Sequence, residues 1–191
     1  MWDKITTKMC KYKIISSNET EYMKYALILL YEKWISILSC LIIAAYFHCV
    51  FEMILFLLFF CNLRKYTGGF HLKSFIACYS ISMLYALCIA YTVAYLLPTK
   101  FILFLILIAS DFVILLIGAI NHPNMMWDKK EEKESKRKAR CVVITETLII
   151  CLMTLVGVNV KIVSCAILGE MSCAMLLLLA KCFGQEVKAD E

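Results

Sequence analysis

The sequence is poor in glycine, proline and charged residues, which form the turns and the solvated surface of a globular protein. Its 191 residues include 6 glycines and 2 prolines, and 18% of them are charged, compared with roughly 25% in a soluble domain. Hydrophobic residues make up 62% of the chain, and its mean hydropathy is +0.79. These figures exclude a disordered protein, a coiled coil and an ordinary soluble enzyme, and they favour a small multi-pass membrane protein.

Metal-binding and disulfide patterns are also missing. No two of the 11 cysteines form a CxxC pair, so neither a zinc pattern nor a redox motif is present. Nine of them lie within or at the edges of apolar stretches, where a thiol behaves as a small hydrophobic group: Cys40, Cys49, Cys61, Cys88, Cys141, Cys151, Cys165, Cys173 and Cys182. We therefore expect no disulfide scaffold, no metal site and no cofactor.

Long apolar stretches predict an all-α integral membrane protein. At about 20 residues per crossing, one span each is expected over residues 75–97, 101–120, 141–160 and 162–179. Residues 26–63 are too long for one crossing and fit two short ones, with a turn near His48 to Glu52. The sequence therefore predicts a single domain over residues 1–191, in which residues 26–180 form a bundle of about six transmembrane helices and residues 181–191 a polar tail.

The polar segment 1–25 carries apolar residues at helical spacing, with lysines mainly between them. One interpretation is a short basic amphipathic helix on an anionic membrane face. An ordinary basic flank before the first span fits equally well. Either interpretation places this segment on the cytoplasmic side.

The basic residues indicate which loops face the cytoplasm. With the amino terminus inside and six crossings, 18 of the 20 lysines and arginines lie on the cytoplasmic side. The outer loops then hold only Lys100 and Lys161. This positive-inside bias favours six crossings with both termini in the cytoplasm.

A polar segment over residues 64–74 interrupts the apolar pattern and carries the candidate chemistry. It contains Gly68, Gly69 and His71, and Cys78 follows seven residues after the histidine. An imidazole that takes the thiol proton generates a thiolate, which can attack an acyl carbon. On one straight helix the seven residues would rise by roughly 10.5 Å, too far for a hydrogen bond between the two side chains.

The glycine pair offers a solution, because glycine adopts backbone conformations closed to other residues. His71 can then lie on a loop that folds back toward Cys78 on the next helix, and the glycine amides can donate to a developing oxyanion. The alternative is a glycine turn with an interfacial histidine, which is the commoner meaning of such a pattern.

Arg64, Gly68, Gly69, His71 and Cys78 resemble the signature of the accessory gene regulator protein B (AgrB) family of bacterial membrane cysteine endopeptidases. The arginine, the Gly-Gly-x-His group and the cysteine seven residues after the histidine are all kept. The resemblance extends to chain length, the basic amino-terminal segment and the multi-span layout. One departure is Leu72, where family members commonly have a small residue.

The resemblance implies an activity and a substrate. Cys78 would be the nucleophile and His71 its general base, acting near the cytoplasmic face of the bacterial cell membrane. The substrate would be an AgrD-like quorum-sensing propeptide, cleaved through a thioester and then closed into a thiolactone or lactone ring. Arg64 would contact the precursor or hold the loop. The family also suggests a homodimer in the lipid bilayer, and no nucleic-acid partner is expected.

Three carboxylates fall inside apolar spans: Asp111, Glu146 and Glu170. Intramembrane carboxylates are costly and normally face the bundle interior. Glu146 is level with the proposed site, so it is our candidate for a group that orients His71, although a structural hydrogen bond is the commoner role. A small transporter or channel, or a non-catalytic membrane scaffold, remains the rival interpretation of the whole chain.

Overall fold

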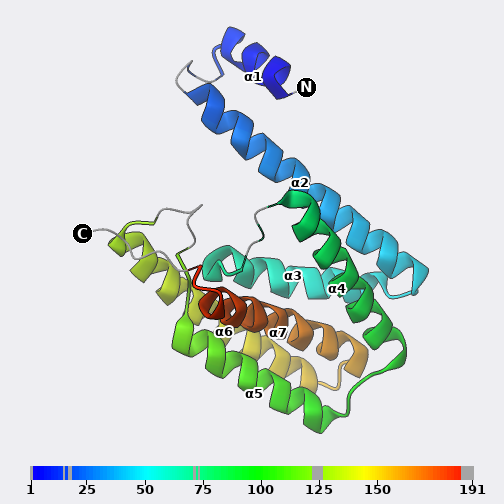
Figure 1. The fold of residues 1–191 in the computed structure, drawn as a ribbon. Coiled ribbons are helices and arrows are strands. Elements are labelled where there is room, and N and C mark those ends of the chain that lie inside the picture. Colours follow the sequence, from blue (N-terminus) through cyan, green and yellow to red (C-terminus); the bar gives the residue numbers. More distant parts are fainter. Residues whose placement is uncertain are drawn as a thin grey trace.

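The computed structural model describes residues 2–14, 16, 19–70, 72, 74–121 and 127–185. Within them the chain forms one short helix and six long ones and contains no strand, which confirms the all-α class (Figure 1). The helices are α1 (Trp2–Lys11), α2 (Thr20–Tyr46), α3 (Val50–Thr67), α4 (Phe75–Tyr95), α5 (Lys100–Ile117), α6 (Lys129–Leu155) and α7 (Val160–Cys182).

Four of these helices are long and apolar enough to cross a membrane: α2, α4, α5 and α7. The other two long helices contain no 18-residue window that is equally apolar and has so few charges. In α3 the charged residues are Glu52 near its start and Arg64 and Lys65 in its last turn, and α6 has a strongly charged first half. The count of six crossings therefore stays a prediction.

The long apolar stretch over residues 26–63 divides into two helices, as expected. The break lies at residues 47–49, where His48 adopts a left-handed backbone with a φ of 55°. A histidine tolerates this conformation better than most side chains, so the turn needs neither glycine nor proline. The predicted turn reached too far, because Glu52 already lies in the first turn of α3.

Two segments expected to be polar loops are partly helical. Helix α3 continues through Arg64 and Lys65, whose positive charges interact favourably with the carboxyl end of a helix. Helix α6 begins at Lys129, so the mostly charged residues 129–140 between two predicted spans, called the charge run below, are helical and continuous with the apolar half of α6. A capping box between Asp128 and Glu131 starts this helix, and i,i+4 ion pairs support it.

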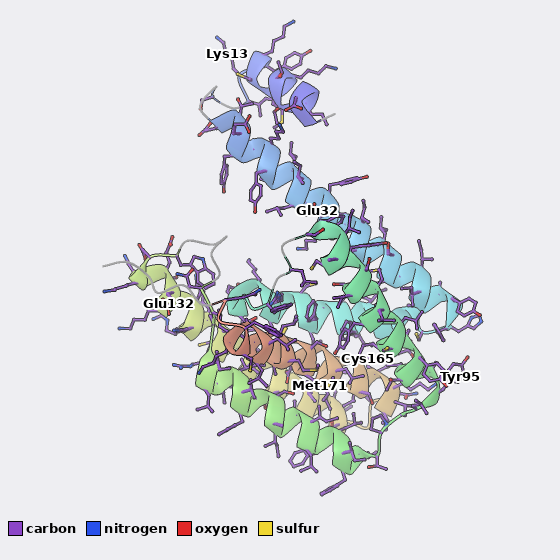
Figure 2. All side chains as sticks on the ribbon, in the orientation of Figure 1. Lys13, Glu32, Tyr95, Glu132, Cys165 and Met171 are labelled. Atoms are coloured by element: carbon purple, nitrogen blue, oxygen red, sulfur yellow. The ribbon has the colours of Figure 1, made fainter. Side chains whose placement is uncertain are left out.

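Helix α7 lies at the centre of the bundle, against α3, α4, α5 and α6 (Figure 1). Its buried positions include Gly169, where an added Cβ would lie 3.0 Å from the carbonyl oxygen of Phe56. The glycine therefore lets α3 and α7 approach closely. Figure 2 shows Cys165 and Met171 of α7 in the middle of the bundle.

Helices α1 and α2 depart from this compact arrangement. The amino-terminal half of α2 projects away from the bundle and carries α1 at its end (Figure 1). Large apolar side chains are exposed along α2, among them Leu30, Trp34, Leu38 and Ile42. Such exposed apolar residues suit a helix surrounded by lipid.

Candidate active site

The candidate site is built on the end of α3. Helix α3 stops at Gly68, which has a φ of 63° and whose N–H donates to the carbonyl oxygen of Arg64 at 3.2 Å. Gly69 follows with a φ of 111°. Two successive positive φ angles require glycine, and they turn the chain sharply out of the helix. We call residues 68–70 the glycine turn.

Arg64 holds the glycine turn from inside. Its guanidinium donates to the carbonyl oxygen of Gly68 and, at 2.8 Å, to that of Phe70. Charged donors make stronger hydrogen bonds than neutral ones. Of the two roles predicted for Arg64, holding the loop is therefore the one for which the structure has contacts.

The glycine turn is also fixed to two other parts of the bundle. The N–H of Phe70 donates to the carbonyl oxygen of Leu176 on α7 at 3.1 Å, and the N–H of Ile120 donates to that of Thr67 at 2.9 Å. An added Cβ on Gly69 would lie 3.2 Å from the Leu176 oxygen. These contacts bring the carboxyl ends of α3, α5 and α7 together at one end of the bundle.

Two of the residues that hold the turn, Leu176 and Ile120, were not predicted from the sequence. Leu176 contributes only its backbone carbonyl, so its side chain carries no signal. Ile120 is followed by Asn121, a buried asparagine whose side chain donates to the Trp127 carbonyl oxygen at 3.0 Å and accepts from the Trp127 N–H at 3.1 Å. A polar residue at the end of an apolar stretch is a weak signal that such a turn is held together.

Cys78 lies in the first turn of α4, where its N–H donates to the carbonyl oxygen of Ser74 at 3.0 Å. The residue is partly exposed. The guanidinium of Arg64 lies within electrostatic range of Cys78. The nucleophile candidate therefore interacts electrostatically with the arginine that holds the glycine turn.

His71 lies outside the described residues, as does Lys73. The described residues near it in the chain include Phe70, whose backbone is fixed at both its N–H and its carbonyl, and Ser74, which precedes α4. The approach of His71 to Cys78 stays a prediction.

Glu146 lies in α6, which packs against α3. Its side chain is buried, and its Oε1 atom accepts from the amide of Asn62 at 2.8 Å. The two residues line a pocket of about 220 Å³ between α3 and α6, together with Leu58, Phe59, Cys141, Val142, Thr145 and Ile149. The contacts found for Glu146 join it to α3, not to the glycine turn, and its role as an orienting group stays a prediction.

The cysteines lie both inside the bundle and on its surface. All 11 are free thiols, and Cys40, Cys49, Cys165 and Cys173 are buried. Among the described residues, no group of three or more histidine, cysteine, aspartate and glutamate side chains is placed to hold a metal ion.

Comparison with known proteins gives a match along most of the chain. The family model described as "Accessory gene regulator B" matches residues 2–180. A "Putative AgrB-like protein" of Clostridium perfringens (strain SM101 / Type A) is 24% identical over 159 residues, which cover 80% of this chain and 74% of that protein. The "Putative AgrB-like protein 2" of Clostridium perfringens (strain 13 / Type A) is 24% identical over 147 residues, 73% of this chain and 69% of that protein. No solved structure matches the chain.

Proposed function

Because the chain belongs to the accessory gene regulator B family, we propose that it is a membrane cysteine endopeptidase that cleaves an AgrD-like propeptide. Cys78 is the nucleophile of this proposal and His71 is its general base. The observation that carries it is that Cys78 lies on the first turn of α4 and interacts electrostatically with Arg64, whose side chain holds the glycine turn that leads directly into His71.

The reaction begins when the imidazole of His71 takes the thiol proton of Cys78. The thiolate sulfur attacks a backbone carbonyl carbon of the precursor and forms a tetrahedral oxyanion. The N–H of Gly68 is already used at the end of α3, so the predicted oxyanion contact rests on Gly69. The C–N bond then breaks, and the departing amine of the tail takes the proton from the imidazolium.

The product of this step is a thioester between Cys78 and the precursor. A cysteine thiol or serine hydroxyl within the precursor attacks the thioester carbon, which closes the ring and returns the thiol to Cys78. Exchange of one thioester for another is nearly isoenergetic, so ring closure competes with hydrolysis if water is excluded.

Charge at the same end of the bundle supports an acidic tail as the leaving part. Arg64 and Lys65 end α3 there, and the charge run of α6 begins after the turn that Asn121 and Trp127 close. A positive field raises the local concentration of an anionic segment. We place this end in the cytoplasm, with both termini, and we expect two copies of the chain in the membrane.

The test uses the full chain reconstituted in lipid with a propeptide that has an amphipathic leader, a central cysteine and an acidic tail. Wild type should release the tail, whereas Cys78→Ala and His71→Ala should not. Cys88→Ala is the matched control, because Cys88 is an exposed thiol on the same helix, and it should cleave as wild type does.

Two results would contradict the assignment. Tail release by either Cys78→Ala or His71→Ala would remove that residue from the mechanism. Alkylation of Cys78 no faster than that of Cys88 would argue against an activated thiol at position 78.

A further inference from the structure

Three helices each place a carboxyl group inside the bundle. Glu170 of α7 is completely buried, Glu146 of α6 is 4% exposed, and Asp111 of α5 is half-buried. The contacts of these three residues do not connect them to the proposed peptidase site. An ionised carboxylate in a membrane interior is costly unless a donor or a cation compensates it.

Asp111 and Glu170 face one another across the packing of α5 against α7, close enough for their carboxyl groups to share a hydrogen bond. When both are ionised, each can only accept. Among the described residues, no N–H or O–H group donates to either oxygen of Glu170. The contact therefore lacks the hydrogen that would make it favourable.

The neighbouring polar groups do not supply that hydrogen. The Thr147 hydroxyl lies 3.0 Å from one Asp111 oxygen and 3.1 Å from the other, on the α6 side, and also 2.8 Å from the Val143 carbonyl oxygen. Its single proton serves one of these acceptors and leaves the contact with Glu170 unbridged.

No described cation neutralises the pair either. Glu146 of α6 faces Glu170. Other ionisable groups on the packed helices face α7 or α5 elsewhere: Tyr85 from α4, Arg64 and Cys61 from α3, Cys173 from α7, and Arg140 from α6, which donates to the Leu115 carbonyl oxygen of α5. Glu146 adds a further negative charge when ionised. Arg64 faces Cys173 and is engaged by the carbonyls of the glycine turn.

We propose that Asp111 and Glu170 form a proton-binding site, in which the carboxyl of Glu170 keeps a proton and donates it in a hydrogen bond to Asp111. The bound ligand is a proton, and no metal is required. The site joins α5 to α7 through one O–H···O bond between two otherwise incompatible acceptors.

The pair joins α5 to α7, the helix that also anchors the glycine turn. Leu176, which accepts from the Phe70 N–H, follows Glu170 on the same helix. Loss of the proton would place two negative charges in contact and push α5 away from α7. Because the folded chain would hold a proton that the unfolded chain releases, stability should fall as the pH rises through the titration of the pair.

Infrared spectroscopy of the full chain in lipid nanodiscs tests the proton directly. At neutral pH the wild type should show the C=O stretch of a protonated carboxyl, distinct from the carboxylate bands. Glu170→Gln should remove it, and Asp111→Asn should shift it. Glu146→Gln should leave it in place, which assigns the proton to the pair. Glu134→Gln is the matched control, because Glu134 is an exposed carboxylate paired with Lys138.

Thermal unfolding gives a second measurement. The number of protons released on unfolding at mildly alkaline pH should fall by about one in Glu170→Gln, whose amide still donates to Asp111. A wild-type spectrum without a protonated carboxyl at neutral pH would overturn the proposal. This measurement uses the wild type alone, so it does not depend on whether any variant folds. Stability that depends on sodium or potassium at fixed pH would assign the site to a cation instead.

Discussion

The Nη2 atom of Arg64 lies 2.8 Å from the carbonyl oxygen of Phe70, so the last turn of α3 holds the residue that directly precedes His71. The same guanidinium also donates to the Gly68 carbonyl. A single side chain therefore spans the glycine turn from its first residue to its last, and the backbone that leads into the proposed base is fixed by it.

Arg64→Lys should impair propeptide processing although it keeps the charge. A lysine ammonium lacks the planar fork that reaches two carbonyl oxygens at once, and the loss of one hydrogen bond to a charged group costs about 1.5–3 kcal/mol. We expect a fall of about ten- to a hundred-fold in the rate of tail release, on the scale of that cost. Lys100→Gln is the control, because Lys100 is exposed at the start of α5, whereas the glycine turn lies at the carboxyl end of that helix. Equal rates for both variants would argue that Arg64 only contributes charge.

Gly69→Ala should lower both stability and propeptide processing more than an alanine substitution at an exposed glycine does. Gly69 has a φ of 111°, and an added Cβ would overlap the Arg64 guanidinium and lie 3.2 Å from the Leu176 carbonyl oxygen. Gly157 is the matched control, since its φ is 79° and nothing lies within 4 Å of an added Cβ. Gly157→Ala should cost about 1–2 kcal/mol in unfolding free energy and retain processing, whereas Gly69→Ala should lose both stability and processing. Comparable effects at the two positions would contradict the tight packing of the turn.

Glu146→Gln separates the two roles considered for this buried carboxyl. The glutamine oxygen can still accept from Asn62, so the α3–α6 hydrogen bond survives the change. If that bond is the whole role of Glu146, processing should stay within about two-fold of wild type while Asn62→Leu lowers the melting temperature, since the loss of the bond leaves a buried acceptor unsatisfied. A large fall in kcat for Glu146→Gln, with Asn62→Leu unaffected, would support orientation of His71 by Glu146.

Much of the fold could be predicted from the distribution of apolar residues. The spans of α4 and α5 begin and end close to the expected positions, because Pro98 and Gly118 interrupt the apolar pattern nearby. The helical charge run of α6 could not be predicted from hydropathy. Its helix depends on a capping box and on i,i+4 ion pairs, which are local interactions that hydropathy does not register.

The candidate site was predictable in its residue types but not in its supports. Arg64, Gly68, Gly69 and Cys78 are all recognisable from their spacing. Nothing in the sequence indicates that the Leu176 carbonyl oxygen accepts a hydrogen bond from the Phe70 N–H, because every residue has a backbone carbonyl. The contact between Asp111 and Glu170 also depends on how α5 packs against α7, which no local pattern specifies.

The pairing of α1 with α2 should weaken in acid. Asp3 of α1 lies 2.5 Å from the ammonium of Lys24 on α2, and this contact lowers the pKa of the Asp3 carboxyl below its ordinary value. A carboxyl with a depressed pKa contributes stability that is present at neutral pH and is lost as the pH falls through the depressed pKa. The protection factors of the α1 amides, corrected for the intrinsic pH dependence of exchange, should therefore fall on acidification and in Asp3→Asn at neutral pH, by about five-fold at most because the pair is exposed. High salt should reduce the difference between wild type and variant.

Glu21→Gln removes an exposed carboxylate from the first turn of α2, and it should leave exchange in α1 unchanged. Equal protection of α1 in wild type and Asp3→Asn at low salt would mean that packing alone holds this helix in place.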